Sequence, residues 1–215
     1  MKMSTCRTGL LAFAATAALL SCRKKEAAPD IPMAPSHAGD SADATTAAPA
    51  AATSADGSLV QVAGISFTAP PSWRREQPSS SMRAAQFAIP GGGNEKDGSV
   101  AVYYFGTGQG GGVDENVARW QGQFSDPSGT PPAPTVTHSE SHGLKVTIMT
   151  VKGTYASGMP MGPSTPEPGF ALWGAIIENP RGSVFVKATG PSALIARERP
   201  RFEALLASLR PSTSM

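Results

Sequence analysis

Short strand-like runs separated by polar turns fill the chain from residue 59 onwards and predict a series of β-strands. The runs are separated by residues that favour turns, namely glycine, proline, asparagine and aspartate. The runs are 59–63 with 65–68 (counted as one bent run), 82–89, 99–105, 135–141, 144–154, 170–177 and 183–189. A tight hairpin is signalled at His142-Gly143 and a four-residue turn at 179–182. Such short connections favour antiparallel pairing.

Two other segments repeat their apolar residues with helical spacing. The first has Asp114 and Glu115 near its start, where acidic residues suit the positive end of a helix, and its apolar stripe is Val113, Val117, Trp120 and Phe124. The second begins near Ser192 and contains Pro200. Proline is tolerated in a first helical turn, so we expect a short turn and then a helix from Pro200 to Leu209. Its buried stripe is Phe202, Leu205, Leu206 and Leu209.

The N-terminal 21 residues have the layout of a secretory signal. Lys2 and Arg7 precede an apolar run of eleven residues from Leu10 to Leu20, which is too short to span a bilayer. The end of this segment, Leu19-Leu20-Ser21-Cys22, resembles the lipobox of bacterial lipoproteins, although that family prefers Ala, Ser or Thr where Leu20 stands. The resemblance implies cleavage before Cys22 and lipidation of this cysteine, which would anchor the chain to a membrane of the bacterial cell envelope.

Between this signal and the strands lies a segment that cannot bury a core. From Glu26 to Gly57 it contains 12 alanines among 32 residues, repeated prolines and no aromatic residue. We therefore predict a disordered linker. The expected organisation is a signal peptide at 1–21, a lipidated cysteine with its linker at 22–57 and one globular domain at 58–211.

Strands grouped around a few helices indicate an α+β fold with an antiparallel sheet flanked by helices. At its start, Ile65-Ser-Phe67-x-x-Pro70-x-x-Trp73 resembles the first strand and turn of the PsbP-like sandwich. Near its end, Phe185-Val-Lys187-Ala-Thr-Gly190-Pro191 with the closing helix is similar too. That fold hosts unrelated binding roles, so the resemblance implies no activity and no site residues.

Charge and cysteine content narrow the function classes. The chain has 18 basic and 16 acidic residues, and the signal segment takes two of the basic ones. The remainder has zero formal charge, whereas a nucleic-acid binder usually has a basic excess. Cys6 would leave with the signal and Cys22 would carry lipid, so the mature domain has no thiol for a disulfide or for cysteine-based metal chemistry.

Two sequence motifs offer candidate chemistry. Side chains alternate along a strand, so His138, Glu140 and His142 would share a face and could bind zinc or copper, with Met159 and Met161 as further soft ligands. The alternative is a polar hairpin rim, because His142 falls at the predicted turn. Gly106-x-Gly108-x-Gly110-Gly111, with Asp126 further on, formally matches a dinucleotide fingerprint, but no parallel strand is expected to follow its helix.

The sequence thus predicts an envelope lipoprotein whose domain is a non-enzymatic binding or accessory module without a cofactor. We expect a monomeric domain that meets a small ligand or an envelope protein, through the long loops at 91–93 and 157–168. Trp73, Trp120 and Trp173 are expected in the core. The alternative is a metal-handling protein or hydrolase that uses His138, Glu140 and His142, and the metal content of the purified protein would separate the two.

Overall fold

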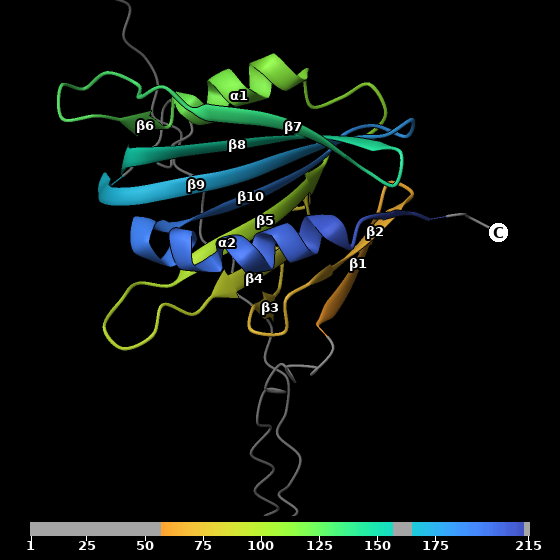
Figure 1. The fold of residues 1–215 in the computed structure, drawn as a ribbon, viewed down its shortest axis with the longest axis horizontal. Helices are drawn as coiled ribbons and strands as arrows, with labels where there is room; N and C mark the ends of the chain where they lie inside the picture. Colours follow the sequence, from red (N-terminus) through yellow and green to blue (C-terminus); the bar gives the residue numbers. More distant parts are fainter. Residues whose placement is uncertain (1–56, 157–164, 213–215) are drawn as a thin grey trace, which may run out of the picture. The chain divides into compact units, whose positions relative to one another are not determined.

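Eleven strands and two helices make up the part of the chain that the computed structural model describes, residues 57–156 and 165–212. Each strand pairing in this part is antiparallel. The fold is therefore α+β with antiparallel sheets and two helices, as the sequence predicts (Figure 1).

Eight strands form the main sheet, and three form a small one. The order in the main sheet is β3 (Arg74–Glu76), β4 (Arg83–Ile89), β5 (Gly98–Tyr104), β10 (Val184–Pro191), β9 (Glu167–Glu178), β8 (Leu144–Tyr155) and β6 (Phe124–Ser125), with β7 (Thr135–Ser141) also paired to β8. The small sheet has the order β1 (Ser58–Val62), β2 (Ile65–Ala69) and β11 (Arg210–Pro211).

The larger core lies between the main sheet, the small sheet and the long helix α2 (Ser192–Ala207). Side chains of the helix reach this core, and the Phe202 ring packs 4.1 Å from the Trp173 ring between centroids. Trp73 is buried in the same core and donates its indole N–H to the buried Glu198 carboxylate at 2.8 Å, which satisfies both polar groups.

A second core lies on the opposite face of the main sheet, under the short helix α1 (Val113–Gln121). The Trp120 ring packs over Gly174 of β9, so closely that a Cβ there would lie 2.2 Å from the ring. Phe124 and Met149 are buried beside it, and Val113 and Val117 pack against this cluster. All three tryptophans are thus core residues, as expected.

The run counted as one bent strand is in fact a hairpin. Val62 of β1 pairs with Ile65 of β2 across a two-residue turn, in which Ala63 and Gly64 have φ angles of 51° and 77°. Two consecutive residues with positive φ match the twist of a tight hairpin. His142 and Gly143, with φ angles of 51° and 79°, form the predicted tight turn between β7 and β8.

The expectation that Pro200 starts the second helix is wrong. Helix α2 is continuous from Ser192 to Ala207, and Pro200 lies inside it. Proline removes the bond to the carbonyl of Ala196, but Ala196 is exposed, so water can replace that donor. Buried side chains on both sides of the proline, among them Leu194, Ile195 and Phe202, hold the two halves in line.

Three short strands and one helix end also differ from the prediction. Strands β3, β6 and β11 have only two or three residues, too few for an alternating pattern to be recognised. Helix α1 ends at Gln121, so Phe124 belongs to β6, although its ring still joins the cluster under the helix. No helix in residues 57–156 and 165–212 has the length and apolar character needed to cross a membrane.

Candidate functional site

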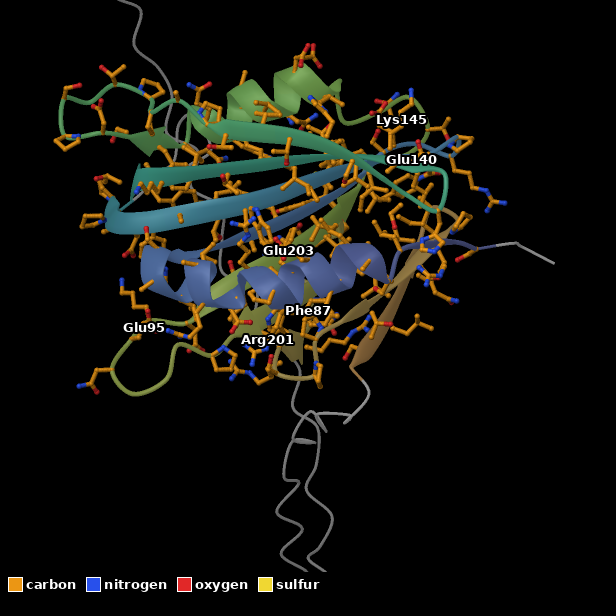
Figure 2. The ribbon with its side chains drawn as sticks, viewed as in Figure 1. Phe87, Glu95, Glu140, Lys145, Arg201 and Glu203 are labelled. Atoms are coloured by element: carbon orange, nitrogen blue, oxygen red, sulfur yellow. The ribbon has the colours of Figure 1, made fainter. Side chains whose placement is uncertain are left out.

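The sequence-predicted metal ligands are not brought together. His138, on β7, contacts the Thr147 hydroxyl through Nδ1 at 3.1 Å, whereas His142 turns away and its Nδ1 lies 3.0 Å from the Arg210 guanidinium. Glu140 is exposed opposite Lys145 at the hairpin end of β7 and β8 (Figure 2). In the part of the chain with assigned positions, no three His, Cys, Asp or Glu side chains could share a metal ion.

The glycine-rich motif forms a loop before α1. Gly106, Gly108, Gly110 and Gly111 all have positive φ, as flexible turns require. Helix α1 then leads to β6, which pairs antiparallel with β8, so the parallel strand of a dinucleotide site does not follow. Asp126 accepts hydrogen bonds from Ser128 and Thr130 within its own turn, which lowers the pKa of its carboxyl.

Several sequence candidates lie outside the described residues: Cys22, Met159, Met161 and residues 157–164 of the second candidate contact loop.

What the structure adds is a pocket that the sequence did not reveal. It lies on the α1 side of the main sheet, over strands β5 and β10, and measures about 290 Å³. We call it the sheet-face pocket. Small side chains of Ser99, Ala101 and Thr189 make its floor.

The pocket exists because α1 covers only part of this face. The helix packs over β8 and β9, where Trp120 meets Gly174, and on this side Gln86 of β4 stays half-buried and Ser99 of β5 exposed. Ser99 is exposed and Tyr103 is half-buried, in contrast to Phe185 under the helix. A smaller cavity of about 170 Å³ shares Tyr103 and Lys187 with the pocket and extends it towards α1.

Lys187 lies at the centre of the pocket. It occupies the middle of β10, directly opposite Ala101 of β5 and Gly174 of β9, neither of which has a side chain large enough to cover it. Its ammonium group donates to the Gln123 side-chain oxygen at 2.5 Å and to the Tyr155 hydroxyl at 3.2 Å. Two of its three N–H donors are therefore used, which leaves one directed at neither group.

The electrostatics of Lys187 show that its charge is poorly compensated. Among the residues with described positions, no carboxylate lies within ion-pair distance of Lys187 or of the neighbouring Arg83. Burial lowers the pKa of Lys187 to about 8, and the Arg83 charge acts in the same direction. Burial also raises the pKa of Tyr155, with Tyr103 as the next contribution, so this phenol keeps its proton.

Two tyrosines face these cations. The Arg83 guanidinium lies 5.6 Å from the centroid of the Tyr103 ring, and the Lys187 ammonium lies 5.2 Å from that of Tyr155. Both distances suit a cation–π contact. Tyr103 comes from β5 and Tyr155 comes from β8, so the two rings lie on opposite sides of β10, the strand that carries Lys187.

Two acidic residues, Asp97 and Glu167, line the pocket, whereas Gly91, Gly92 and Gly93 of the first candidate contact loop do not. The β4–β5 loop, which contains the glycine run, supplies Asp97, and the start of β9 supplies Glu167. Each acid has a basic partner, since Asp97 lies 3.6 Å from Arg74 and Glu167 lies 2.8 Å from Lys96. The sequence signal that could have found the site is Lys187 itself, the single charged residue in the run 183–189.

A larger pocket of about 450 Å³ lies on the α2 side, beside Trp173 and Ile195. It is mostly apolar, and the charged side chains at its edge, Lys152 and Arg199, are exposed; Arg199 already pairs with Glu203 at 2.8 Å. Ligand sites need polar groups that converge on the bound molecule. The smaller sheet-face pocket meets this requirement better.

Comparison with known proteins identifies neither a family nor a curated relative. No family model and no curated sequence matches the chain. Among solved structures, a Bacteroides thetaiotaomicron protein overlaps with a TM-score of 0.42 at 10% identity, over 74% of this chain and 50% of its own. The chain thus spans half the length of that protein. A Pseudomonas aeruginosa protein of unknown function gives 0.41 at 15% identity, over 73% of this chain and 98% of its own.

A cyanobacterial PsbP from Synechocystis is also similar, with a TM-score of 0.43 at 11% identity, over 69% of this chain and 87% of its own. Overlaps of this size assign neither homology nor function. The structure defines the class of the protein as an α+β domain with a polar pocket on its main sheet.

Proposed function

We propose that this chain is an exported lipoprotein, held at a membrane of the bacterial cell envelope by lipid on Cys22, whose domain binds a small ligand and catalyses no reaction. The tether is supported by the order of signal, lipobox-like cysteine and alanine-rich linker. The binding role is supported by one observation above all, the partly buried Lys187 that faces a pocket without a carboxylate partner.

Burying an uncompensated charge is unfavourable for folding, so such a residue needs another reason to be there. A ligand that pairs with Lys187 when bound would supply that reason. Catalysis is less well supported. The Lys187 ammonium donates to Gln123 and Tyr155, which holds it as a hydrogen-bond donor and disfavours the role of a base.

The anchor is tested by replacing Cys22 with Ser in the native or a related bacterial host. A diacylglyceryl group plus an amide-linked chain gives stable attachment, and the apolar run at 10–20 cannot replace it after cleavage. We expect wild-type protein in the membrane fraction with a lipid-modified N-terminal peptide, and the variant as an unlipidated precursor or a released form. A wild-type N-terminus without lipid would refute the tether.

The binding site is tested by filling it. Ala101→Leu places extra carbon atoms on the floor of the pocket, which has room for them. We expect that some compounds of a mixed small-molecule library raise the melting temperature of the wild-type chain and lose this effect in the variant. Hits that affect both proteins equally would place the site elsewhere, for example in the pocket beside Trp173.

A further inference from the structure

Resting on the proposed binding role of the sheet-face pocket, we propose that its ligand is a small anion in which a carboxylate or phosphate group is attached to a planar body. The inference depends on the net charge of the pocket, its free donors and its aromatic walls. Each of these is a property of side chains on the main sheet.

The charges in and next to the pocket leave one positive charge in excess. Glu167 pairs with Lys96 at 2.8 Å, and Asp97 lies 3.6 Å from Arg74, which also pairs with Glu76 at 3.3 Å. Arg83 donates to the neutral Gln86 side chain at 2.6 Å, and Lys187 donates only to neutral oxygens. Two cations without an acidic partner favour an anion between them, because each gains the opposite charge that it lacks.

The free hydrogen-bonding capacity in the pocket consists mainly of donors. Lys187 retains one N–H, and the Tyr155 hydroxyl accepts from that lysine. The Thr189 hydroxyl bonds with Tyr155 and lies 3.2 Å from the Ser99 hydroxyl, so two of the three hydroxyl protons serve these bonds and one remains for a ligand. An oxyanion, which only accepts hydrogen bonds, matches such a set.

Aromatic rings wall the pocket on two sides. On the β8–β9 side the rings of Tyr155 and Phe170 are stacked, with centroids 6.2 Å apart and planes 4° from parallel. On the β5 side Tyr103 stacks on Phe105 in the same way, at 6.0 Å and 9°. Flat aromatic surfaces favour a flat partner. At about 290 Å³ the pocket is close to the lower limit of small-molecule sites, about 300 Å³, so the ligand is small.

Binding should depend on pH through Lys187. The ionisable groups around it are Arg83 from β4, Asp97 and Tyr103 from β5 and its flank, Tyr155 from β8, Glu167 from β9 and Arg119 from α1. With a pKa of about 8, Lys187 is mostly protonated at pH 7, and about one molecule in thirty is protonated at pH 9.5. Anion affinity should therefore fall by up to about 30-fold between these pH values, and binding above pH 8 should take up a proton.

The experiment is isothermal titration calorimetry of the full chain in a mild nonionic detergent. The probes are benzoate and phenyl phosphate, with benzamide as the neutral analogue and inorganic phosphate as the anion without a planar body. We expect benzoate or phenyl phosphate to bind more tightly than both comparison compounds. Lys187→Met should weaken this binding by roughly tenfold or more, as expected for a charged hydrogen bond. The matched control, Lys152→Met, changes an exposed lysine of β8 and should leave affinity unchanged.

Several results would overturn the inference. Equal binding of benzoate and benzamide would show that binding does not depend on the charge of the ligand. Equal anion affinity of wild type and Lys187→Met would show that the anions bind elsewhere. Binding of inorganic phosphate as tight as that of phenyl phosphate would remove the planar body from the proposal. Failure of both aromatic anions to bind would refute the anion class.

The last result need not refute the proposed binding function. If neutral or cationic library compounds still raise the wild-type melting temperature and Ala101→Leu abolishes that effect, the pocket binds a ligand of another class. If no compound depends on the pocket, the proposed binding function fails as well.

Discussion

Lys187 shows how a single residue can favour a site at the expense of stability. Its pKa is lowered from 10.5 to about 8, so between these values the unfolded chain binds more protons than the folded one. Burial of Lys187 therefore lowers the free energy of unfolding by its full amount below pH 8. This destabilisation shrinks as the pH increases from 8 to 10.5. The shift alone sets an upper bound of about 3 kcal/mol, which partial exposure reduces.

We therefore expect Lys187→Met to raise the free energy of unfolding by about 1–2 kcal/mol at pH 7, because a side chain of similar length replaces an uncompensated charge. The gain should shrink as pH approaches 10.5. Urea denaturation between pH 7 and 10.5 measures both effects, with Lys152→Met as the control at an exposed strand position. A destabilised Lys187→Met protein would show that the lysine contributes more through its bonds than its burial costs.

Gly174 is a second residue whose role is set by its surroundings. An alanine Cβ would lie 2.2 Å from the Trp120 ring, which is rigid and packed on the second core. We expect Gly174→Ala to lower the free energy of unfolding by roughly 2–4 kcal/mol. The control is Gly122→Ala at the end of α1, where φ is −63° and the nearest atom is 3.4 Å away, so thermal unfolding should change little.

Neither residue could be identified from the sequence as part of the site. The pattern around Gly174 predicts a strand correctly, yet the need for glycine depends on a ring from a helix more than fifty residues earlier. Lys187 lies within the sequence motif that resembles the PsbP-like fold. Its role in the pocket, however, depends on Arg83, Tyr103 and Tyr155, which the strand order brings together. By contrast, the metal-site hypothesis for His138, Glu140 and His142 depends on local spacing alone. The turn at His142 directs its side chain away from His138.

At the scale of elements, long and regular segments were predictable, and short or context-dependent ones were not. Strand β7 matches its predicted bounds, because the proline-rich segment before Thr135 and the His142-Gly143 turn delimit it. The prediction that α2 starts at Pro200 is wrong, because side chains on both sides of the proline are buried and hold the helix together. Tertiary packing of the helix outweighs the local cost of the proline.

Replacing Pro200 with Ala should accordingly stabilise the domain. The substitution restores the N–H that can bond to the Ala196 carbonyl and removes the steric clash of the ring. Part of the gain of about 3 kcal/mol is offset, because the unfolded chain becomes more flexible, which leaves an expected increase of about 1–2 kcal/mol. Chemical denaturation measures it. A decrease in stability would mean that α2 needs a bend at this position.

At the scale of the whole molecule, the boundary near residue 58 stays a prediction. The abrupt change from an alanine- and proline-rich segment to alternating strands motivates it. We expect limited proteolysis of the full chain to leave a stable fragment that starts between about residues 55 and 62, within the usual uncertainty of a boundary. Mass spectrometry of the fragment gives its ends. Survival only of fragments that retain the linker would contradict an independently folding domain.

The pairing of an early strand with the last one has a consequence for the timing of folding. Strand β11 pairs with β2, the Ser212 amide donates to the Gly64 carbonyl at 2.7 Å, and the larger core joins Ile65 and Phe67 to Phe202 and Leu209. A ribosome makes the N-terminal part first, and that part has no complete core until the C-terminal helix is available. A chain that must cross a membrane unfolded would benefit from this delay, because a premature native fold could block its own translocation.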